Sequence, residues 1–420
     1  MGVTRCRGQA RAPKGEIEES RPPRVVIVLT HPIQYFSPLF AEIARRGVVT
    51  EDVIYGNDAG VRRGFDSGFA RETSWDVDLL HGYSYRFITK GDRPRGSVDL
   101  RGVLRLLAGL RRHEVIVVHG YSTSLTALTI MYAVLSRTPY LLRTDSSVLK
   151  RRAWWDARRW WVTGVVRRSG GVLTSGSRNA EVYAALGARR LLFAPFSVDA
   201  DRFAQGTEMT QEQRLEIRSE FDIPPEARVA VFAGKLRPHK RPQDLVHVMN
   251  QMPRGTFALV LGDGPLRAEL EASAPHTVRF AGFRNQAEMP RLMASADILV
   301  LPSEIEPWGL VVNEGLACGL VPVCSEAVGC APDLVSGTGV VFATGDVAAL
   351  AKAMEEAFGM AGSPEFAAAR RTYLRDHSIS ASAHGYEVAV TTLSHAAQAT
   401  GDPEAGPPRS GTPCATHGEK

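Results

Sequence analysis

The chain has 420 residues, 44% of them hydrophobic, 23% charged and 8% aromatic; this length predicts two domains of ordinary size, and the composition excludes collagen-like and repeat proteins. The formal net charge of +5 suits phosphate-bearing ligands or an anionic membrane surface. Because Lys and Arg are dispersed and no nucleic-acid-binding motif occurs, we expect no nucleic-acid partner.

The two ends of the chain are expected to be disordered tails, over residues 1–23 and 398–420. The first segment is rich in Arg, Glu, Gly and Pro and has no apolar stretch of the signal-peptide type. The longest apolar stretch, 125–135, is too short to span a bilayer. The five cysteines match no zinc spacing. These features predict a cytoplasmic protein, with the inner face of the membrane as a possible site of contact.

The first half of the chain alternates short apolar runs with helical patterns. The run RVVIVLT at 24–30 is uninterrupted and predicts a buried parallel strand. Residues 56–80 form a loop-like insertion with several aromatic residues. The alternation is typical of a doubly wound α/β domain, here 24–198. The expected strands are 24–30, a short one near 53, 114–120, 139–143, 171–175 and 190–195, and the expected helices are 36–46, 122–136, 149–168 and 178–186.

The second half repeats this pattern after a linker expected at 199–227, which includes a polar helix near 210–220. It predicts a second Rossmann-like domain over 228–378, followed by a helix over 379–397 that packs back on the first domain. Two successive domains of this kind bring the carboxyl ends of their strands to a central cleft, where ligands bind. The expected strands are 227–235, 256–264, 278–282, 297–303 and 321–324, and the expected helices are 265–272, 286–295 and 309–318.

The most informative segment is LPSEIEPWGLVVNEGLACGLVPV, at 301–323. Glu306 follows a predicted strand and Glu314 lies within the next helix, so the two carboxylates are about 12 Å apart along the helix axis. The helix begins near Gly309 and Leu310, where free N–H groups and the helix dipole favour a phosphate. A pyrophosphate bound there would have one carboxylate beside the sugar and the other beside the ribose. A helix start or a solvated face explains either Glu taken alone equally well.

A basic turn precedes this segment, in AGKLRPHKRP at 233–242. Gly234 ends the predicted strand, and Lys235 and Lys240 lie on either side of a strand-to-helix turn. Two cations at that position would neutralise a diphosphate and stabilise it as a leaving group. Taken alone, such a turn is more often simply solvated.

Together the two segments resemble family 4 retaining glycosyltransferases, which have the GT-B fold of two Rossmann-like domains facing a cleft. The family usually has Gly and an aromatic residue after the first Glu; here Pro307 and Trp308 stand there. The resemblance implies a nucleotide-sugar donor bound mainly by the second domain. In it the first Glu orients the sugar, the second Glu binds the ribose, and the two Lys bind the phosphates.

Three further segments of the second half are similar to the family. LGDGPLR at 261–267 contains its GDGP turn and makes Gly264 a candidate donor contact. VRFAGF at 278–283 matches a strand whose end contacts the base, which makes Phe283 and Arg284 candidates. Asp333 stands where many relatives have Glu, and we interpret it as a structural residue at a helix start.

The first half resembles a bacterial subgroup of the same family through THPIQYFSPLF at 30–40 and WDVDLLHGYSY at 75–85. Its position after the first strand makes three residues candidates for the acceptor side of the cleft. These are His31, Gln34 and Tyr35.

Two residues at later strand ends of the first half are also candidates. His119 corresponds to a histidine that relatives place beside the donor sugar, although a lone His is more often structural. Arg143 ends the next strand and is a weaker candidate for a phosphate or acceptor contact.

The resemblance implies transfer of a hexose-type sugar to a hydroxyl acceptor with retention of configuration, without metal and without a further cofactor. Two Asp-x-Asp triplets, at 76–78 and 199–201, are interpreted as structural. A nucleotide-sugar epimerase of the same fold and a catalytically inert scaffold are the alternatives.

A Trp- and Arg-rich helix is predicted at 150–168. Helical spacing places Trp154, Trp161 and Val165 on one face. Such a helix would suit an anionic membrane surface, but we favour an ordinary helix with its Trp face in the core.

Overall fold

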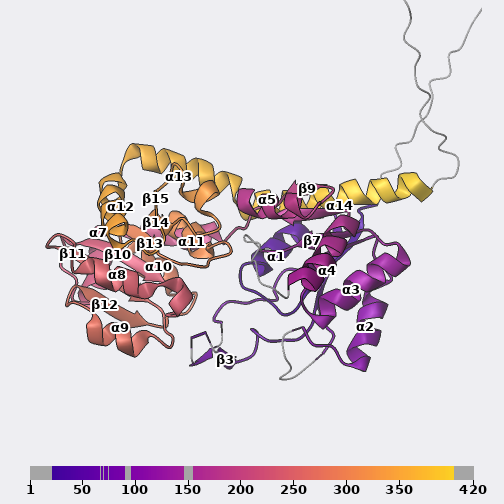
Figure 1. Cartoon of the computed structure of the whole chain (residues 1–420), viewed down its shortest axis with the longest axis horizontal. Helices are drawn as coiled ribbons and strands as arrows, with labels where there is room; N and C mark the ends of the chain where they lie inside the picture. The colour runs from indigo at the N-terminus through magenta and orange to yellow at the C-terminus, as the bar shows by residue number, and fades with distance from the viewer. Residues whose placement is uncertain are drawn as a thin grey trace, which may run out of the picture.

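The computed structural model describes residues 21–66, 68–69, 71–73, 75–89, 96–145 and 155–401. They form two lobes, each built on a parallel sheet with helices packed against it (Figure 1). The predicted α/β architecture with two Rossmann-like domains is therefore confirmed. The tails expected at the ends of the chain lie mostly outside the described residues.

The N-terminal lobe contains a seven-stranded sheet in the order β5-β2-β1-β6-β7-β8-β9. The order reverses between β1 and β6, which is the switch point where such folds bind ligands. Its central strands are unbroken apolar runs because both faces of the sheet are covered. The strands are β1 Arg24–Leu29, β2 Thr50–Tyr55, β5 Tyr85–Phe87, β6 Val115–His119, β7 Tyr140–Arg143, β8 Gly171–Thr174 and β9 Leu191–Phe193, and the helices are α1 Ser37–Arg46, α2 Leu100–Leu110, α3 Ser124–Ser136, α4 Trp155–Arg168 and α5 Ser177–Ala185.

The C-terminal lobe contains a six-stranded sheet in the order β12-β11-β10-β13-β14-β15. Gly262 and Gly264, just after β11, pack against the backbone after β10: a Cβ on either would lie within 2.6 Å of a backbone oxygen there. The strands are β10 Arg228–Ala233, β11 Thr256–Leu261, β12 Val278–Gly282, β13 Ile298–Leu301, β14 Val321–Ser325 and β15 Val340–Phe342, and the helices are α8 Pro242–Met249, α9 Arg267–Ser273, α10 Met289–Ala294, α11 Leu310–Ala317, α12 Val347–Met360 and α13 Pro364–Asp376.

The segment expected as a linker, 199–227, forms two helices that belong to the C-terminal lobe. They are α6 Ala200–Ala204 and α7 Gln211–Glu220, and α6 packs against α10 and α11. On α7, Arg214 and Arg218 donate to the carboxylate of Asp297, at 2.5 and 3.3 Å. The segment is therefore anchored to one lobe.

The last helix, α14 Ile379–Gly401, returns from the C-terminal lobe to the N-terminal lobe (Figure 1). It packs against α1, β8 and β9, and Glu387 forms an ion pair with Arg46 at 2.7 Å. The helix ends at Gly401, four residues beyond the expected end at 397, so residues 398–401 are helical rather than part of a tail.

Asp333 joins the two lobes directly. Its carboxylate accepts hydrogen bonds from the backbone N–H of Ser177, at 3.0 and 3.1 Å, and from the Ser177 hydroxyl at 3.1 Å. A Cβ on Gly176 would lie 2.4 Å from this carboxylate, so the close approach requires glycine. Asp333 is structural, as expected, but the helix start it binds is that of α5 in the other lobe.

The structure describes two Trp side chains on α4, and both are exposed to solvent. Trp160 is 79% exposed and Trp161 is 40% exposed, while Val162, Val165 and Val166 form the buried face. The expectation of a Trp face in the core is therefore wrong for Trp161, because the valines supply that face instead. Residues 146–154, with Trp154, lie outside the described residues, as does the side chain of Trp155.

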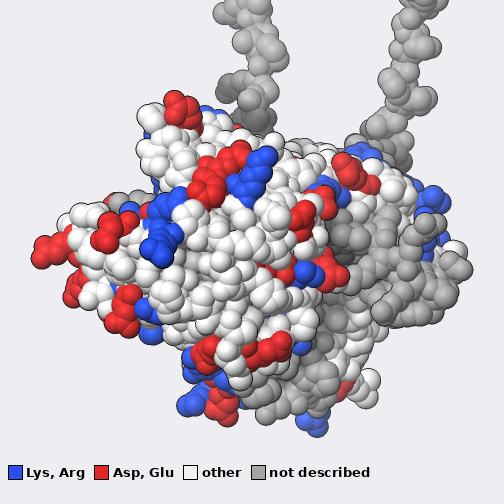
Figure 2. Space-filling view, turned by 60° about the vertical axis from the view of Figure 1, so that its left-hand side comes forward, with Lys and Arg blue, Asp and Glu red and all other residues white. Residues whose placement is uncertain are grey.

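Acidic and basic side chains alternate over the described surface in Figure 2, so this face of the molecule presents no extended basic patch. In the part of the chain that the structure describes, no helix combines the length and apolarity needed to cross a membrane.

Candidate active site between the two lobes

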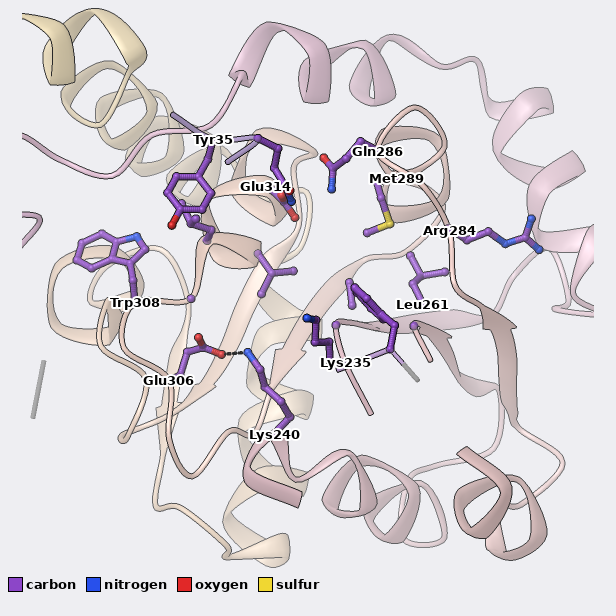
Figure 3. A pocket seen from close by; sticks show the side chains of 18 of the residues that line it. Tyr35, Lys235, Lys240, Leu261, Arg284, Gln286, Met289, Glu306, Trp308 and Glu314 are labelled. Atoms are coloured by element: carbon purple, nitrogen blue, oxygen red, sulfur yellow. Dashed lines mark hydrogen bonds and ion pairs between the residues drawn. The ribbon is translucent and has the colours of Figure 1, made fainter. Parts of the chain in front are cut away.

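A cavity of about 350 Å³ lies between the lobes (Figure 3). The N-terminal lobe contributes the loop after β1 and the insertion at 56–80, and the C-terminal lobe contributes the ends of β10 and β11, the segment after β12 and the start of α11. The structure brings together most of the site residues predicted from sequence. The predicted residues that line this cavity are Gln34, Tyr35, Gly234, Lys235, Lys240, Phe283, Arg284, Glu306, Gly309, Leu310 and Glu314.

The start of α11 forms one wall of the cavity. Gly309 is the N-cap residue, with φ of 99° and no side chain to cap the helix. The first N–H groups of a helix have no acceptor within it, and those of Leu310 and Val311 lie at this wall. An anion is the favoured ligand for such a helix end.

Lys240 and Glu306 both line the cavity, and their side chains form a direct ion pair (Figure 3). Lys240 ends the short 3₁₀ turn Pro238–Lys240, which Arg241 terminates in a left-handed conformation with φ of 48°. Glu306 lies in the loop between β13 and α11. The charges of these two predicted functional residues thus neutralise each other.

Lys235 is also paired, but with a residue that the sequence analysis did not single out. Its Nζ lies 2.9 and 3.0 Å from the two carboxylate oxygens of Asp66, which ends β3 Gly64–Asp66 in the insertion. Burial opposes ionisation of Asp66, yet the hydrogen bonds from Lys235 and from the N–H groups of Gly68 and Phe69 hold its pKa below the usual value. This ion pair joins the lobes across the cavity.

Aromatic side chains of the insertion pack over the end of β12. The ring of Phe69 lies 4.9 Å from that of Phe283 at 78°, and the ring of Trp75 lies 6.5 Å from it. All three line the cavity. The aromatic residues noted in this insertion therefore form part of the site, whereas the side chain of Phe65 lies outside the described residues.

Glu314 lies deep in the cavity wall, on α11. Burial raises its pKa to about 7, and the nearby charge of Arg202 only partly opposes this shift. Arg202 is held by Gln286, donating to its backbone and side-chain oxygens at 2.7 and 2.9 Å. The Glu314 carboxyl is therefore near the midpoint of its titration at neutral pH.

His119 lies in a second cavity of about 230 Å³ in the N-terminal lobe. This cavity adjoins the first, because Tyr35, Asp145 and Phe196 line both. Burial, together with the charge of Arg143, holds the pKa of His119 well below the usual value. Its Nε2 lies 3.2 Å from the hydroxyl of Tyr386 on α14, so a neutral imidazole faces this cavity.

Two predicted residues lie away from both cavities. The Nδ1 of His31 lies 2.8 Å from the Thr30 hydroxyl, and His31 is not among the residues lining either cavity. Gly264 packs on the backbone of Leu236, while Gly262 lines the cavity in its place.

Several cavity residues were not predicted because no local motif marks them. Their positions follow from folding alone: the insertion and the strand end after β7 approach residues that are distant in sequence. These residues are Phe69, Trp75, Asp145, Phe196, Gln286 and Met289, which line the cavity, and Asp66, which is paired with the cavity residue Lys235.

Three of the four carboxylates in the two Asp-x-Asp triplets accept hydrogen bonds from backbone N–H groups. Asp76 accepts from Ala287 in the other lobe at 3.2 Å, Asp78 accepts from Leu80 at 2.9 Å, and Asp199 caps α6. No group of three or more His, Cys, Asp or Glu is placed to hold a metal ion among the described residues.

Residues 213–368 match the family model described as glycosyl transferases group 1. This segment contains the basic turn, both Glu residues and the start of α11. Among curated proteins, the chain is 31% identical over 204 residues to 2-deoxystreptamine glucosyltransferase of Streptomyces kanamyceticus, covering 45% of this chain and 51% of that protein. It is 30% identical over 155 residues to D-inositol 3-phosphate glycosyltransferase of Mycobacterium marinum, covering 34% and 32%. The chain thus spans about half the length of the first relative and a third of the second.

Solved structures resemble most of the chain. Anabaena Alr3699/HepE in complex with UDP-glucose aligns with a TM-score of 0.65 at 14% identity, covering 90% of this chain and 99% of that protein. A glycosyltransferase from Rickettsia africae aligns with a TM-score of 0.66 at 13% identity, covering 89% and 98%. At such identity the likeness concerns the fold. The chain has the α/β GT-B fold, and its residues 213–368 are similar to the group 1 glycosyl transferases.

Proposed function

We propose that this chain is a glycosyltransferase that moves a sugar from a nucleoside diphosphate sugar to a hydroxyl acceptor, with retention of configuration. One observation carries the proposal. Within the segment matched by the group 1 family, two Lys, two Glu and a helix N-terminus line a single cavity. Cations and helix N–H groups suit a diphosphate, and carboxylates suit the hydroxyls on either side of it.

The arrangement supports a specific orientation of the donor. The diphosphate would lie between Lys235, Lys240 and the start of α11. Glu314 would accept hydrogen bonds from the ribose, and Glu306 from the transferred sugar. The base would lie near Phe283 and the insertion. The Anabaena neighbour, which was solved with UDP-glucose, makes this donor the first to test.

The donor replaces existing ion pairs in this proposal. Lys240 is bound to Glu306, and Lys235 to Asp66. A diphosphate brings negative charge that competes for both ammonium groups and releases Glu306 for the sugar. As the bond to the sugar breaks, charge grows on the diphosphate, and fixed cations stabilise it most at that stage.

We propose no metal and no further cofactor, because Lys235 and Lys240 provide the positive charge that a divalent ion supplies elsewhere. A thermal-shift screen of nucleoside diphosphate sugars tests the donor assignment, since a ligand that binds only the folded state raises Tm. UDP-glucose or another member of the panel should raise Tm in wild type and much less in Lys235→Ala/Lys240→Ala. The proposal fails if no member raises Tm.

The N-terminal lobe would supply the acceptor side and, we propose, contact an anionic membrane through α4. Trp160 and Trp161 are exposed, and Arg159, Arg167 and Arg168 are exposed on the same helix. Trp rings suit the membrane interface and Arg the headgroups.

Flotation with phosphatidylglycerol vesicles at low salt tests the membrane contact. Wild type should float, and Trp160→Ser/Trp161→Ser should not. Val341→Ser, an exposed apolar residue of the other lobe, serves as the matched control. Equal flotation of the double variant and wild type would show that α4 has no such role.

A further inference from the structure

The second cavity contains a guanidinium group that its surroundings satisfy only in part. Arg143 ends β7 and is 1% exposed. Its Nη1 donates to the carbonyls of Leu173 and Ala194, at 3.2 and 2.6 Å. Its Nε and Nη2 are buried and have no hydrogen-bond partner among the described residues. Three N–H groups of the guanidinium therefore remain unused, and two of them, Nε–H and one Nη2–H, lie on the same edge.

The surroundings hold this side chain firmly in place. The guanidinium lies 4.3 Å from the centre of the Phe196 ring and 6.0 Å from that of Tyr386. Burial lowers the pKa of Arg143, and Tyr386, Tyr35 and Asp145 oppose this only in part. Asp145 is exposed and makes no hydrogen bond to Arg143 among the described residues. The positive charge is thus fixed but incompletely compensated.

The unused edge has a definite chemical preference. Nε–H and Nη2–H point in parallel and match two oxygens of one carboxylate or phosphate, a geometry that Lys cannot provide. A buried donor without a partner is costly, so a ligand that supplies both oxygens removes that cost. The neighbouring His119 is neutral because burial and Arg143 keep its pKa low, and it does not add a competing charge.

We infer that the second cavity binds an anionic group of the acceptor, a carboxylate or a phosphate, at the Nε–Nη2 edge of Arg143. The inference rests on the proposed function, because it assigns this cavity to the acceptor. Tyr35 and Asp145 line both cavities, so an acceptor anchored at Arg143 would bring its hydroxyl past them to the donor. The volume of about 230 Å³ suits a small acceptor, of the size of one ring.

Inorganic phosphate is the probe for this site. The cavity that contains Lys235 and Lys240 also attracts phosphate, so the measurement uses Lys235→Ala/Lys240→Ala as its background. Titration calorimetry should show that this variant still binds phosphate, and acetate more weakly. Adding Arg143→Met should weaken phosphate binding at least tenfold, and adding Arg143→Lys should weaken it less. Arg190→Met, an exposed Arg of the same lobe, is the matched control and should change nothing.

The inference is overturned if the double Lys variant binds no phosphate, or if Arg143→Met binds it as well as the background does. Should Arg143→Met fail to fold, hydrogen exchange in the double Lys variant decides the matter: phosphate must slow exchange in the segment that ends at Arg143. Nucleotide-sugar binding without phosphate binding would refute this inference alone, and the reverse would refute the proposed function alone. Because α4 is proposed to bind vesicles, the lipid source is tested with a soluble short-chain phosphatidylglycerol. Binding that is tighter than that of inorganic phosphate and is lost in Arg143→Met identifies a lipid phosphate, and binding no tighter than that of inorganic phosphate identifies a soluble acceptor.

Discussion

Lys240, Glu306 and Glu314 lie in one cavity but would act at different stages of the reaction. Lys240→Ala should lower kcat by about 10²–10³, because it removes charge from the departing diphosphate. Glu314→Gln should mainly raise the donor KM, since a ribose contact is equal in the ground and transition states. Glu306→Gln should lower kcat while leaving the binding of free nucleoside diphosphate unchanged.

Steady-state kinetics and nucleoside diphosphate titrations separate these three effects. Glu304→Gln is the matched control, because Glu304 is exposed, lies outside the cavity and is two residues from Glu306. If both cavity Glu variants retain the wild-type kcat and donor KM, the segment before and within α11 is only structural.

The burial of Glu314 predicts a pH dependence of donor binding. Its pKa of about 7 means that the carboxyl becomes protonated as the pH falls through 7. Both ribose hydroxyls would donate hydrogen bonds to Glu314, and this requires the ionised carboxylate. The KM for the nucleotide sugar should therefore rise below pH 7, by up to roughly tenfold per pH unit. Glu314→Gln should remove this dependence. A donor KM that stays constant from pH 8 to pH 5.5 in wild type would contradict the assignment of Glu314 to the ribose.

The burial of Glu314 also makes the free energy of unfolding depend on pH, but here the lower pH is the favourable one. The folded state binds the proton of Glu314 more tightly than the unfolded state does, since its pKa is raised from 4.5 to about 7. The contribution of this group to the free energy of unfolding is therefore lost as the pH rises through that interval. A bound donor would offset the loss by using the charged form.

At the scale of elements, the insertion at 56–80 is the main addition to what the motifs predicted. Its antiparallel strands are β3 Gly64–Asp66 and β4 Arg71–Thr73. They reach the C-terminal lobe, where Asp66 forms an ion pair with Lys235. In the proposed donor orientation, a phosphate would take the place of this carboxylate. The insertion would therefore compete with the donor for Lys235.

Removing that carboxylate should strengthen donor binding. Asp66→Asn should lower the dissociation constant of the nucleoside diphosphate sugar by up to about fivefold, since a partly exposed ion pair contributes about 1 kcal/mol or less. Titration of the free donor gives the value. Glu72→Gln, on the same hairpin but paired with Arg63, should bind like wild type. Weaker donor binding by Asp66→Asn would instead make Asp66 a donor contact.

The elements that the sequence predicted well are those whose pattern is local. Parallel strands buried on both faces are unbroken apolar runs, and β1 and β10 were placed within two residues of each end. Four elements of the N-terminal lobe were not predicted: α2, β5 and the two strands of the insertion, β3 and β4, which have three residues each. In α2, Gly102 and Gly109 interrupt the helical pattern, and β5 has only three residues. Within 199–227, α7 lies where a polar helix was predicted, near 210–220, whereas α6 was not predicted. Both were assigned to a linker because their packing on the C-terminal lobe depends on tertiary contacts.

At the scale of the whole molecule, the same contrast holds for the site. The motif around α11 predicted that Glu306, Glu314 and the helix start lie together, since they are close in sequence. Asp66 and Asp145 reach the site only because two lobes close on it, and no spacing along the chain encodes their approach. The unused edge of Arg143 is likewise visible only in the fold, where Leu173 on β8 and Ala194 just after β9 supply two carbonyls to Nη1.

The approach of the two lobes also encloses two lysines in the cavity. Their positive charge is the reason for the proposed independence from metal. Lys235 and Lys240 from the C-terminal lobe face the cavity that the N-terminal lobe completes, and the triplet carboxylates Asp76 and Asp199 already accept backbone N–H groups. Two ammonium groups supply the charge that a diphosphate needs as it departs. Turnover should therefore change less than twofold in excess EDTA, measured by product formation with the donor found in the thermal-shift screen. Activity that disappears with EDTA and returns with Mg²⁺ or Mn²⁺ would mean that the lysines do not suffice.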